Sequence, residues 1–415
     1  MSRLMNTFLS LQQFLEGTKK AFLNGAKNQG PVKLVLGNEA ADLDSFASSI
    51  LYAYLYTMVT APRLHKQEPV HDPVDEREAF FKRLPTPTLP ILSIPRSELS
   101  LRPEHAHLIS SHLSFTLDDV PTLDEIPDTL SSELNTSITL VDHNVLQHSL
   151  ASKFSSRVTG IIDHHADEGK YTNANPRTIT PCGSCVSLVT NHFRNYYPTH
   201  WENIPPTVHS EIARLALAPL LIDTANLTSK VTPIDVVQVT ELLERAGEGF
   251  NREAFYDDLV AAKTDLSALS VDGLLRKDYK QWVGDNGITL GISAITNSLS
   301  SVVKKAGGIE AFTNELTAYA KDKQVDVAVV MTTDSSISGF RRDLLIWGVN
   351  DRTRSFADQF EKNMNEKFKL EQWPNAEDEL AENFQHDGMK AWTQASLDLS
   401  RKQVAPVLRD IANKL

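Results

Sequence analysis

Two aspartates, Asp42 and Asp44, stand one residue apart just after an apolar run that is typical of a buried strand. The stretch reads KLVLGNEAADLDS, from Lys33 to Ser45. Two like charges at a strand end repel each other and lose hydration, which is unfavourable unless a partner compensates them. Divalent cations would provide that compensation, so the spacing indicates two neighbouring metal ions that each bind one of the carboxylates.

Three further segments carry acidic or imidazole side chains where an apolar run ends. They read SITLVDHN, VTGIIDHH and APLLIDTANL, and they supply Asp142 with His143, the His164–His165 pair, and Asp223. Alternating strand and helix signals favour an α/β domain with a parallel sheet, and ligands of such sheets bind beyond the carboxyl ends of the strands. Each segment alone is also explained by a solvated turn or a helix cap. Together they predict a two-metal centre at one sheet edge, which is suited to phosphoryl transfer.

The second half of the chain favours another α/β domain. After residue 244 the sequence is polar and its pattern predicts helices. The segments GITLGISAI, VDVAVVMTTD and DLLIWGVN then predict further strands. We expect a metal-binding domain over residues 1–250, a helical linker or hinge over 251–274, and a smaller α/β domain over 275–415. The active site is expected in the cleft between the two domains. Residues 60–135, rich in proline and charge, are interpreted as a surface excursion whose Arg96 and Arg102 either line a phosphate channel or are ordinary surface residues.

Composition excludes several classes of protein. The 415 residues carry a net charge of −12, which argues against a nucleic-acid coat protein, and no apolar run is long enough to span a membrane. We expect a cytoplasmic protein, with a mitochondrial pool as the alternative, that needs no membrane or nucleic-acid partner; the sequence leaves the oligomeric state open, and a monomer is compatible with it. The two cysteines, Cys182 and Cys185, have redox-motif spacing. Without a second pair for zinc they are interpreted as structural thiols.

The ordered motifs resemble those of the DHH phosphoesterase superfamily, which is named after the triplet Asp163-His164-His165. The matching stretches are GNEAADLDS, LVDHN, GIIDHHADEG and LLIDTANL. SRKQVAPVL at 400–408 and GLLRKDYK at 273–280 are similar to the branch that holds family II inorganic pyrophosphatases, prune-type proteins and fungal exopolyphosphatases. The resemblance extends from about residue 30 to the end of the chain and favours the fungal exopolyphosphatases.

The resemblance implies a role for each matching metal ligand. Asp42 should bind one metal and Asp44 the other, with Asp142 between them as a bridge. His164 and Asp223 should complete the shell of the second metal. A hydroxide that bridges the ions would then attack a terminal phosphorus.

The resemblance also implies which groups hold the substrate. His165 should face its phosphate, and Lys280, Arg401 and Lys402 should reach from the second domain to the phosphate oxygens. GSCVSLV at 183–189 reads as a loop that enters a helix, where free N–H groups bind phosphate or the chain packs closely.

Asn38 bears on the metal and the substrate, because family II pyrophosphatases have a histidine at this position. A hard amide oxygen favours Mg²⁺, with Mn²⁺ or Co²⁺ as alternatives. Asparagine here resembles the pattern of fungal exopolyphosphatases and prune-type proteins, and this resemblance implies an exopolyphosphatase, a phosphoric anhydride hydrolase that releases orthophosphate from the ends of inorganic polyphosphate. The alternatives are a prune-like short-chain polyphosphatase or cyclic-nucleotide phosphodiesterase, a pyrophosphatase, and a scaffold without activity.

Overall fold

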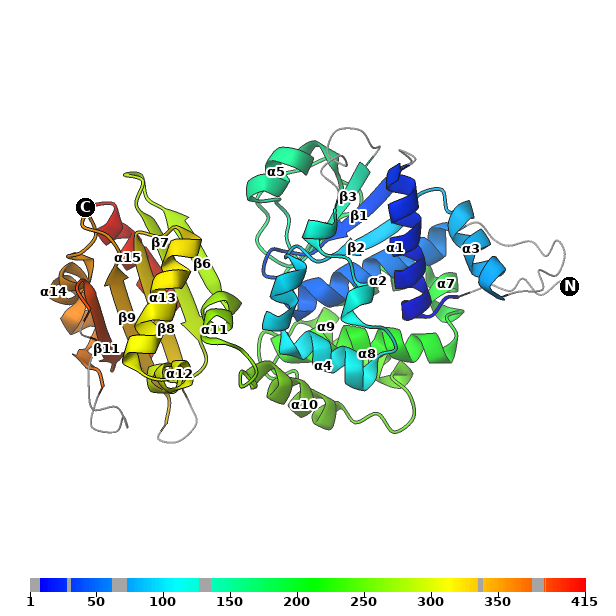
Figure 1. The fold of residues 1–415 in the computed structure, drawn as a ribbon. Coiled ribbons are helices and arrows are strands. Elements are labelled where there is room, and N and C mark those ends of the chain that lie inside the picture. Colours follow the sequence, from blue (N-terminus) through cyan, green and yellow to red (C-terminus); the bar gives the residue numbers. More distant parts are fainter. Residues whose placement is uncertain are drawn as a thin grey trace, which may run out of the picture. The chain divides into compact units, whose positions relative to one another are not determined.

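The computed structural model describes residues 8–27, 31–61, 73–126, 136–334, 339–374, 384 and 386–415. The chain divides into two compact units, Met1–Lys263 and Thr264–Leu415. Each unit contains one sheet with helices packed against it (Figure 1). The segment expected to be a linker is shared between them, since α10 (Arg252–Thr264) ends at the boundary and α11 (Val271–Lys277) packs on the second sheet.

The sheet of the first unit has five strands in the order β2-β1-β3-β4-β5. All of its pairings are parallel, which confirms the expected parallel sheet. The central strands β1, β3 and β4 are neighbours, so the segments that follow their carboxyl ends meet at one edge of the sheet. The strands are β1 (Val32–Leu36), β2 (Thr88–Ile91), β3 (Thr136–Val141), β4 (Val158–Asp163) and β5 (Arg177–Ile179).

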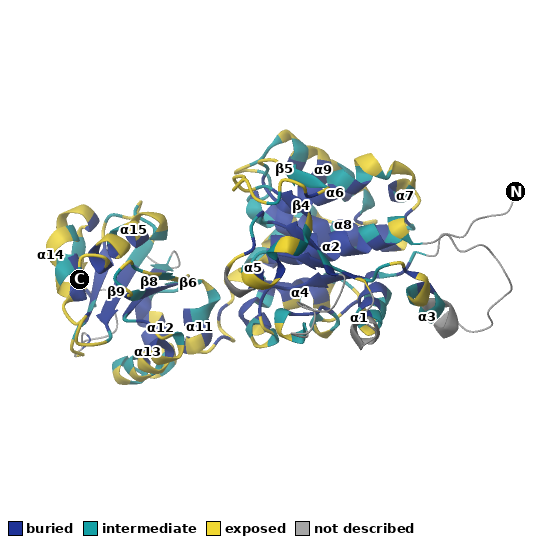
Figure 2. Cartoon of the chain, turned by 90° about the horizontal axis from the view of Figure 1, so that it is seen from above, coloured by how far each residue is buried: buried dark blue, intermediate teal, exposed yellow. Residues whose placement is uncertain are grey.

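Alternating side chains of these strands enter two separate apolar layers. Val35 and Val141 pack with the central helices α2, α6 and α8, whereas Leu34 and Leu140 pack on the other face with α5. Figure 2 shows most of the central strands and much of α2 as buried. The helices of this unit, besides α10, are α1 (Leu11–Lys27), α2 (Leu43–Thr60), α3 (Pro73–Arg83), α4 (Pro103–His112), α5 (His148–Phe154), α6 (Cys185–Tyr196), α7 (Pro198–Glu202), α8 (Pro206–Asp223) and α9 (Pro233–Arg245). Short 3₁₀ helices are η1 (Arg96–Leu101), η2 (Leu117–Asp119), η3 (Leu123–Glu125) and η5 (Ser155–Arg157).

The sheet of the second unit has six strands in the order β10-β11-β9-β8-β7-β6. Only β7 and β8 pair in parallel among these described strands. Apolar side chains of α14 and α15 cover one face, and on the other Tyr319 of α13 lies 3.2 Å from the hydroxyl of Ser293 on β7. The strands are β6 (Tyr279–Val283), β7 (Thr289–Ile295), β8 (Val327–Asp334), β9 (Arg341–Gly348), β10 (Leu370–Gln372) and β11 (Met389–Gln394). The remaining helices are α12 (Leu299–Ala306), α13 (Ile309–Lys323), α14 (Phe356–Phe368) and α15 (Arg401–Ala412).

Two local expectations were wrong. The stretch that contains Lys280 was expected to be helical, but it forms strand β6, because Tyr279, Trp282 and Val283 pair well in a sheet. The segment 60–135 was expected to be a surface excursion, yet it supplies β2, a fully buried strand of the first sheet. Among the described residues, no helix combines the length and the apolarity that crossing a membrane requires.

Candidate metal centre

The loop between β1 and α2 places the first two aspartates at a helix N-terminus. Asp42 is the N-cap of α2, and its carboxylate accepts the backbone N–H of Ser45 at 3.1 Å. Gly37 allows the strand end to approach the helix, because a Cβ at this position would lie 2.7 Å from the Cβ of Ser45. The sequence therefore uses Asp42 both as a helix cap and as an acidic group that faces the centre.

Asp44 lies one residue inside α2 and is buried against the N-terminus of α6. Its two carboxylate oxygens accept the backbone N–H of Cys185 at 2.5 Å and of Val186 at 3.0 Å. The hydroxyl of Ser48 donates to the same carboxylate at 3.1 Å. The free N–H groups of the 183–189 loop, considered as a phosphate site, thus hold a carboxylate of the centre instead.

Asp142 follows β3 in a left-handed backbone conformation, with a φ of 63°. A residue other than glycine rarely adopts this conformation, and such strain is concentrated at functional sites. One carboxylate oxygen accepts hydrogen bonds from the side-chain amide of Asn38 at 2.8 Å and the hydroxyl of Ser45 at 2.7 Å. The other oxygen, Oδ1, is directed to the histidines that follow β4.

Asn38 contacts Asp142 through its amide nitrogen, while its amide oxygen accepts the N–H of Ala40 at 2.9 Å. The amide oxygen that was expected to favour Mg²⁺ thus accepts this N–H, and the amide nitrogen is the group that faces Asp142. Asn38 thereby orients the carboxylate of Asp142.

His164 lies between the two buried aspartates. Its Nε2 is 3.1 Å from Oδ1 of Asp142 and 3.8 Å from Oδ2 of Asp44, and its Nδ1 is 3.0 Å from the carbonyl oxygen of Cys182. A proton on Nδ1 satisfies that carbonyl, so Nε2 is the nitrogen that a metal ion could bind by displacing its proton. Although burial lowers it, hydrogen bonds to Asp142 and Cys182 and the charge of Asp44 raise the pKa of His164 to about 12.

His165 is about half exposed, and its Nδ1 lies 3.8 Å from Oδ1 of Asp142. Its Nδ1 lies 2.8 Å from the carboxylate of Asp163, and this hydrogen bond raises the pKa of His165. Asp163 is itself fixed by the side-chain amide of Asn144 at 2.6 Å. The Asp163 carboxylate therefore contacts the side chains of both Asn144 and His165. It orients the imidazole of His165 so that Nε2 is free.

Asp223 is the last residue of α8 and faces the same group of carboxylates. Burial, followed by the charges of Asp44 and Asp42, raises the pKa of Asp223 to about 8. Burial and the charge of Asp44 likewise raise the pKa of Asp142 to about 7. Such mutual effects require the four carboxyl groups to be neighbours.

The donor set fits divalent cations. Asp142 and His164, with Nε2 and Oδ1 at 3.1 Å, are spaced as two ligands of one ion would be, and together with His165 they form a compact group of potential ligands. Burial and the neighbouring carboxylates raise the pKa values of Asp142 and Asp223, so added positive charge would favour their ionised forms. The structure thus brings together Asn38, Asp42, Asp44, Asp142, His164, His165 and Asp223.

The three predicted cationic residues belong to the second unit. Lys280 is exposed on β6, and Arg401 and Lys402 begin α15. Arg401 donates to the backbone carbonyl of Asp278 at 2.9 Å and to its carboxylate at 2.8 Å. Since Asp278 directly precedes β6, this contact holds the start of α15 beside the strand of Lys280.

Arg96 and Arg102 were considered as the lining of a phosphate channel, but both side chains contact groups of the protein itself. Arg96 forms an ion pair with Glu125 at 2.8 Å and donates to the carbonyl of Val120 at 2.8 Å. Arg102 is buried and donates to the carbonyl of Ala40 in the loop before α2. The excursion therefore braces the loop of Asp42 and Asp44.

Both cysteines are free thiols. Cys185 is fully buried and donates to the carbonyl of Ile162 at 3.2 Å. Cys182 contributes its carbonyl oxygen, which orients His164.

Sequence reasoning missed the groups that orient the ligands, namely Ser45, Asn144 and the carbonyl of Cys182. Ser45 and Asn144 directly follow residues of the recognised motifs, and this adjacency could have indicated them. The role of the Cys182 carbonyl could not be predicted, because every residue has a backbone carbonyl.

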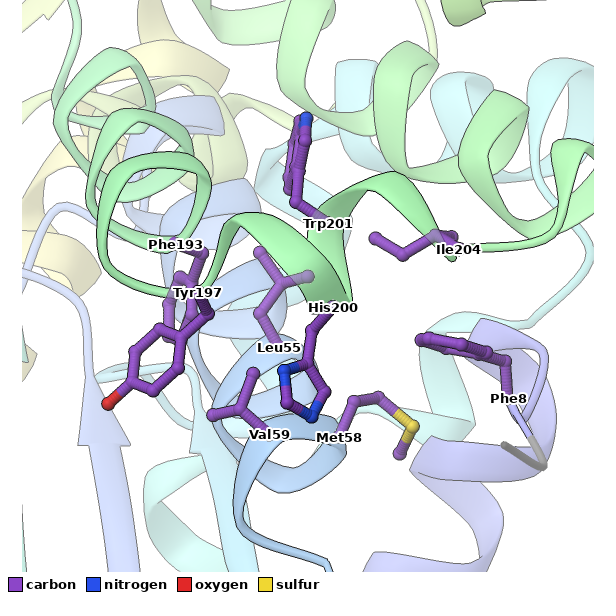
Figure 3. Close-up of a pocket in the computed structure, with 9 residues that line it drawn as sticks. All are labelled: Phe8, Leu55, Met58, Val59, Phe193, Tyr197, His200, Trp201 and Ile204. Carbon is purple, nitrogen blue, oxygen red and sulfur yellow. The ribbon is translucent and has the colours of Figure 1, made fainter. Parts of the chain in front are cut away.

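An apolar hollow in the first unit is a separate feature (Figure 3). None of the predicted site residues lines it, and its walls suit no phosphate. The lining residues are Phe8, Leu55, Met58, Val59, Phe193, Tyr197, His200, Trp201 and Ile204.

Family models match most of the chain. The model "DHH family, N-terminal domain" matches residues 33–220, and the model "DHHA2 domain" matches residues 257–411. The first match contains the motifs after β1, β3 and β4, and the second contains Lys280, Arg401 and Lys402.

Two curated relatives match over long stretches. The "Putative exopolyphosphatase" of Schizosaccharomyces pombe is 33% identical over 97% of this chain and 98% of the relative. The "Probable manganese-dependent inorganic pyrophosphatase" of Brevibacillus brevis is 26% identical over 73% of this chain and 82% of the relative.

Among solved structures, the "putative family II inorganic pyrophosphatase" of Methanococcus jannaschii has a similar fold. It covers 92% of this chain and 100% of its own, with a TM-score of 0.52 and 20% sequence identity. This likeness supports the fold of the chain, in which a parallel sheet and a mixed sheet follow one another.

Proposed function

Because this chain belongs to the DHH family of phosphoesterases, we propose that it is a metal-dependent exopolyphosphatase. It would hydrolyse terminal phosphoanhydride bonds of inorganic polyphosphate and release orthophosphate. The observation that carries the proposal is the convergence of Asp44, Asp142 and His164 at one sheet edge, with Nε2 of His164 directed at both carboxylates. The name of the fungal relative supports the choice of polyphosphate as substrate.

Five residues would hold two divalent cations: Asp42, Asp44, Asp142, His164 and Asp223. When bound, such ions supply positive charge and lower the pKa of a water molecule toward neutrality. We propose Mg²⁺ as the metal, with Mn²⁺ and Co²⁺ as alternatives. The name of the bacterial relative, a manganese-dependent enzyme, supports divalent metal use.

The protein's own groups position and stabilise the reacting phosphate. His165, which is oriented by a hydrogen bond to Asp163 that also raises its pKa, would donate a hydrogen bond to a phosphate oxygen. Asn38 would hold the carboxylate of Asp142 in place. Lys280, Arg401 and Lys402 would bind phosphate oxygens from the second unit, where their charge opposes the charge that develops in phosphoryl transfer.

Asn38 also distinguishes the proposed exopolyphosphatase from the second candidate, a pyrophosphatase. Its amide donates to Asp142 at 2.8 Å and contributes no imidazole ligand. Asn38→His would place an imidazole there, and we expect it to increase Mn²⁺-dependent over Mg²⁺-dependent turnover, because imidazole favours later transition metals. Steady-state rates with each ion measure that ratio.

A substrate panel tests the proposal directly. Initial rates of hydrolysis with Mg²⁺ are compared for long-chain polyphosphate, tripolyphosphate, pyrophosphate, cyclic AMP and a short oligoribonucleotide, by phosphate release or product chromatography. We expect polyphosphate to have the highest kcat/KM. A clear preference for pyrophosphate or cyclic AMP would overturn the proposal in favour of the pyrophosphatase or the prune-like phosphodiesterase.

Lys280→Ala tests the contribution of the second unit. We expect KM for polyphosphate to rise while binding of the metal ions stays unchanged, because the side chain contacts substrate alone. Lys362→Ala, which removes an exposed lysine of α14, serves as the matched control. Weaker metal binding by the Lys280 variant would contradict this assignment.

A further inference from the structure

A second group of metal-ligand side chains joins α4 to α10 in the first unit, the two helices drawn one above the other in Figure 1. It consists of His107 and His112 of α4 and Asp258 of α10. Nε2 of His107 lies 2.6 Å from Oδ2 of Asp258, and Nε2 of His112 lies 3.2 Å from the same oxygen. None of these residues belongs to the centre formed by the DHH motifs.

The arrangement differs from three side chains that merely share a surface. Both imidazoles direct the same ring nitrogen at one oxygen atom, and the three potential ligand atoms lie within 4.8 Å of one another. An ion placed among them would have two nitrogen ligands and one oxygen ligand, with water in the remaining positions.

Core contacts hold His112 and the part of α10 that carries Asp258. The ring of His112 packs edge-on against Phe255 at a centroid distance of 4.7 Å. Phe255 and Leu259, on either side of Asp258 along α10, are buried. The side chains remain 33%, 22% and 44% exposed for His107, His112 and Asp258, which leaves a path for an ion from solvent.

We propose that His107, His112 and Asp258 bind one Zn²⁺ ion that fastens α10 to α4. Two imidazoles and a carboxylate form a donor set that Zn²⁺ accepts and that is too rich in nitrogen for Mg²⁺ or Ca²⁺. The ion stabilises the helix with which the first unit ends, at the boundary after Lys263. It also anchors α4, whose N-cap Arg102 holds the loop of Asp42 and Asp44 through Ala40.

The test counts zinc ions in three full-length proteins: wild type, Asp258→Asn and Asp257→Asn. Asp257 is an exposed neighbour on α10, so its variant makes the same charge change outside the cluster. Each protein is stripped with a chelator, dialysed against micromolar Zn²⁺ in the presence of millimolar Mg²⁺, and analysed for bound metal. Wild type and Asp257→Asn are expected to hold one zinc ion per chain more than Asp258→Asn.

Melting curves provide the second measurement. A ligand that binds only the folded state raises the melting temperature. Zinc should therefore raise it more for wild type and Asp257→Asn than for Asp258→Asn, while all three melt alike in chelator. If Asp258→Asn fails to fold, His107→Gln replaces it with the same expectation.

Equal zinc content and equal zinc-dependent shifts in the cluster variant and the control would overturn the proposal. The result is independent of the proposed function, because it measures bound metal and melting and not hydrolysis. Ions bound at the DHH centre are common to all three proteins and cancel in the comparison.

Discussion

The first unit contains two groups of histidines with a carboxylate that differ in how the fold supports them. Asp142 and His164 follow adjacent strands of a parallel sheet, and Asp142 is 2% exposed. His107, His112 and Asp258 stand on the outside of two helices, with Asp258 44% exposed. Asp142 and His164 each have an orienting partner, Ser45 and the carbonyl of Cys182, whereas the surface group is oriented by its members and one aromatic contact.

The difference teaches what burial adds to a set of ligands. In the buried group, loss of hydration and neighbouring charges raise the pKa of Asp142 and Asp223, which makes the group depend on added positive charge. In the surface group, water already screens the carboxylate. The same residue types therefore give a centre suited to chemistry in one place and a helix fastening in the other.

Asp142→Asn should have the largest effect. We expect turnover to fall by on the order of 10³-fold or more. A neutral amide in place of the carboxylate should lower the affinity for the proposed metal ions, whose charge would stabilise the transition state. Asp258→Asn, the equivalent change in the surface group, should keep activity within about twofold of wild type. Near-normal turnover of Asp142→Asn, measured with saturating Mg²⁺ and polyphosphate, would contradict the assignment of Asp142.

The pH dependence of stability without metal comes next. The folded-state pKa values of Asp142 and Asp223, about 7 and about 8, lie above those of unfolded carboxyl groups, near 3.9. Their protonated forms therefore stabilise the fold fully below pH 3.9, and that contribution is lost as pH rises through 7 to 8. His164, with a raised pKa, acts in the same direction above pH 6.5.

Between pH 5 and pH 8 in chelator, we therefore expect the melting temperature to fall by roughly 5 °C or more. Asp223→Asn should flatten this dependence, and Mg²⁺ or Mn²⁺ should restore stability at pH 8. Differential scanning calorimetry of both proteins across the pH range is the measurement. A melting temperature that rises over this interval would show that the carboxylates already have sufficient counter-charge.

The sequence predicted much of the buried group because strand ends have a simple geometry. Apolar runs followed by Asp or His indicated which segments would meet once β1, β3 and β4 became neighbours in a parallel sheet. The left-handed backbone of Asp142 and the contact between the N-terminus of α6 and Asp44 depend on tertiary packing. Residue types alone did not indicate them.

The surface group shows why the rest escaped prediction. His107 and Asp258 are 151 positions apart, and no motif connects a helix inside the 60–135 segment with a helix near the end of the unit. Only the packing of α4 and α10 makes them neighbours. Lys280 shows the opposite case, in which strand-forming residues were present but a polar context suggested a helix.

Ser45→Ala tests whether a residue that orients a ligand of the buried group contributes to its affinity for metal. The hydroxyl of Ser45 donates to Asp142 at 2.7 Å, and loss of such a contact to a metal ligand typically costs about 10- to 100-fold in affinity or activity. We expect about a tenfold loss of affinity for Mg²⁺, measured by the metal dependence of turnover. Ser49→Ala removes a hydroxyl on the same helix that donates to the carbonyl of Phe46, and it should leave that affinity unchanged.

The smallest effect should come from the surface group without metal. In chelator at pH 7, Asp258→Asn should change the free energy of unfolding by less than about 1 kcal/mol, because exposed ion pairs contribute little. Urea titrations of wild type, Asp258→Asn and Asp257→Asn measure this difference. A loss well above that value would mean that His107 and His112 hold α10 to α4 by direct contact with Asp258. The cluster would then be an ordinary network of ion pairs that needs no metal. It would differ from the buried centre only in its place on the protein surface.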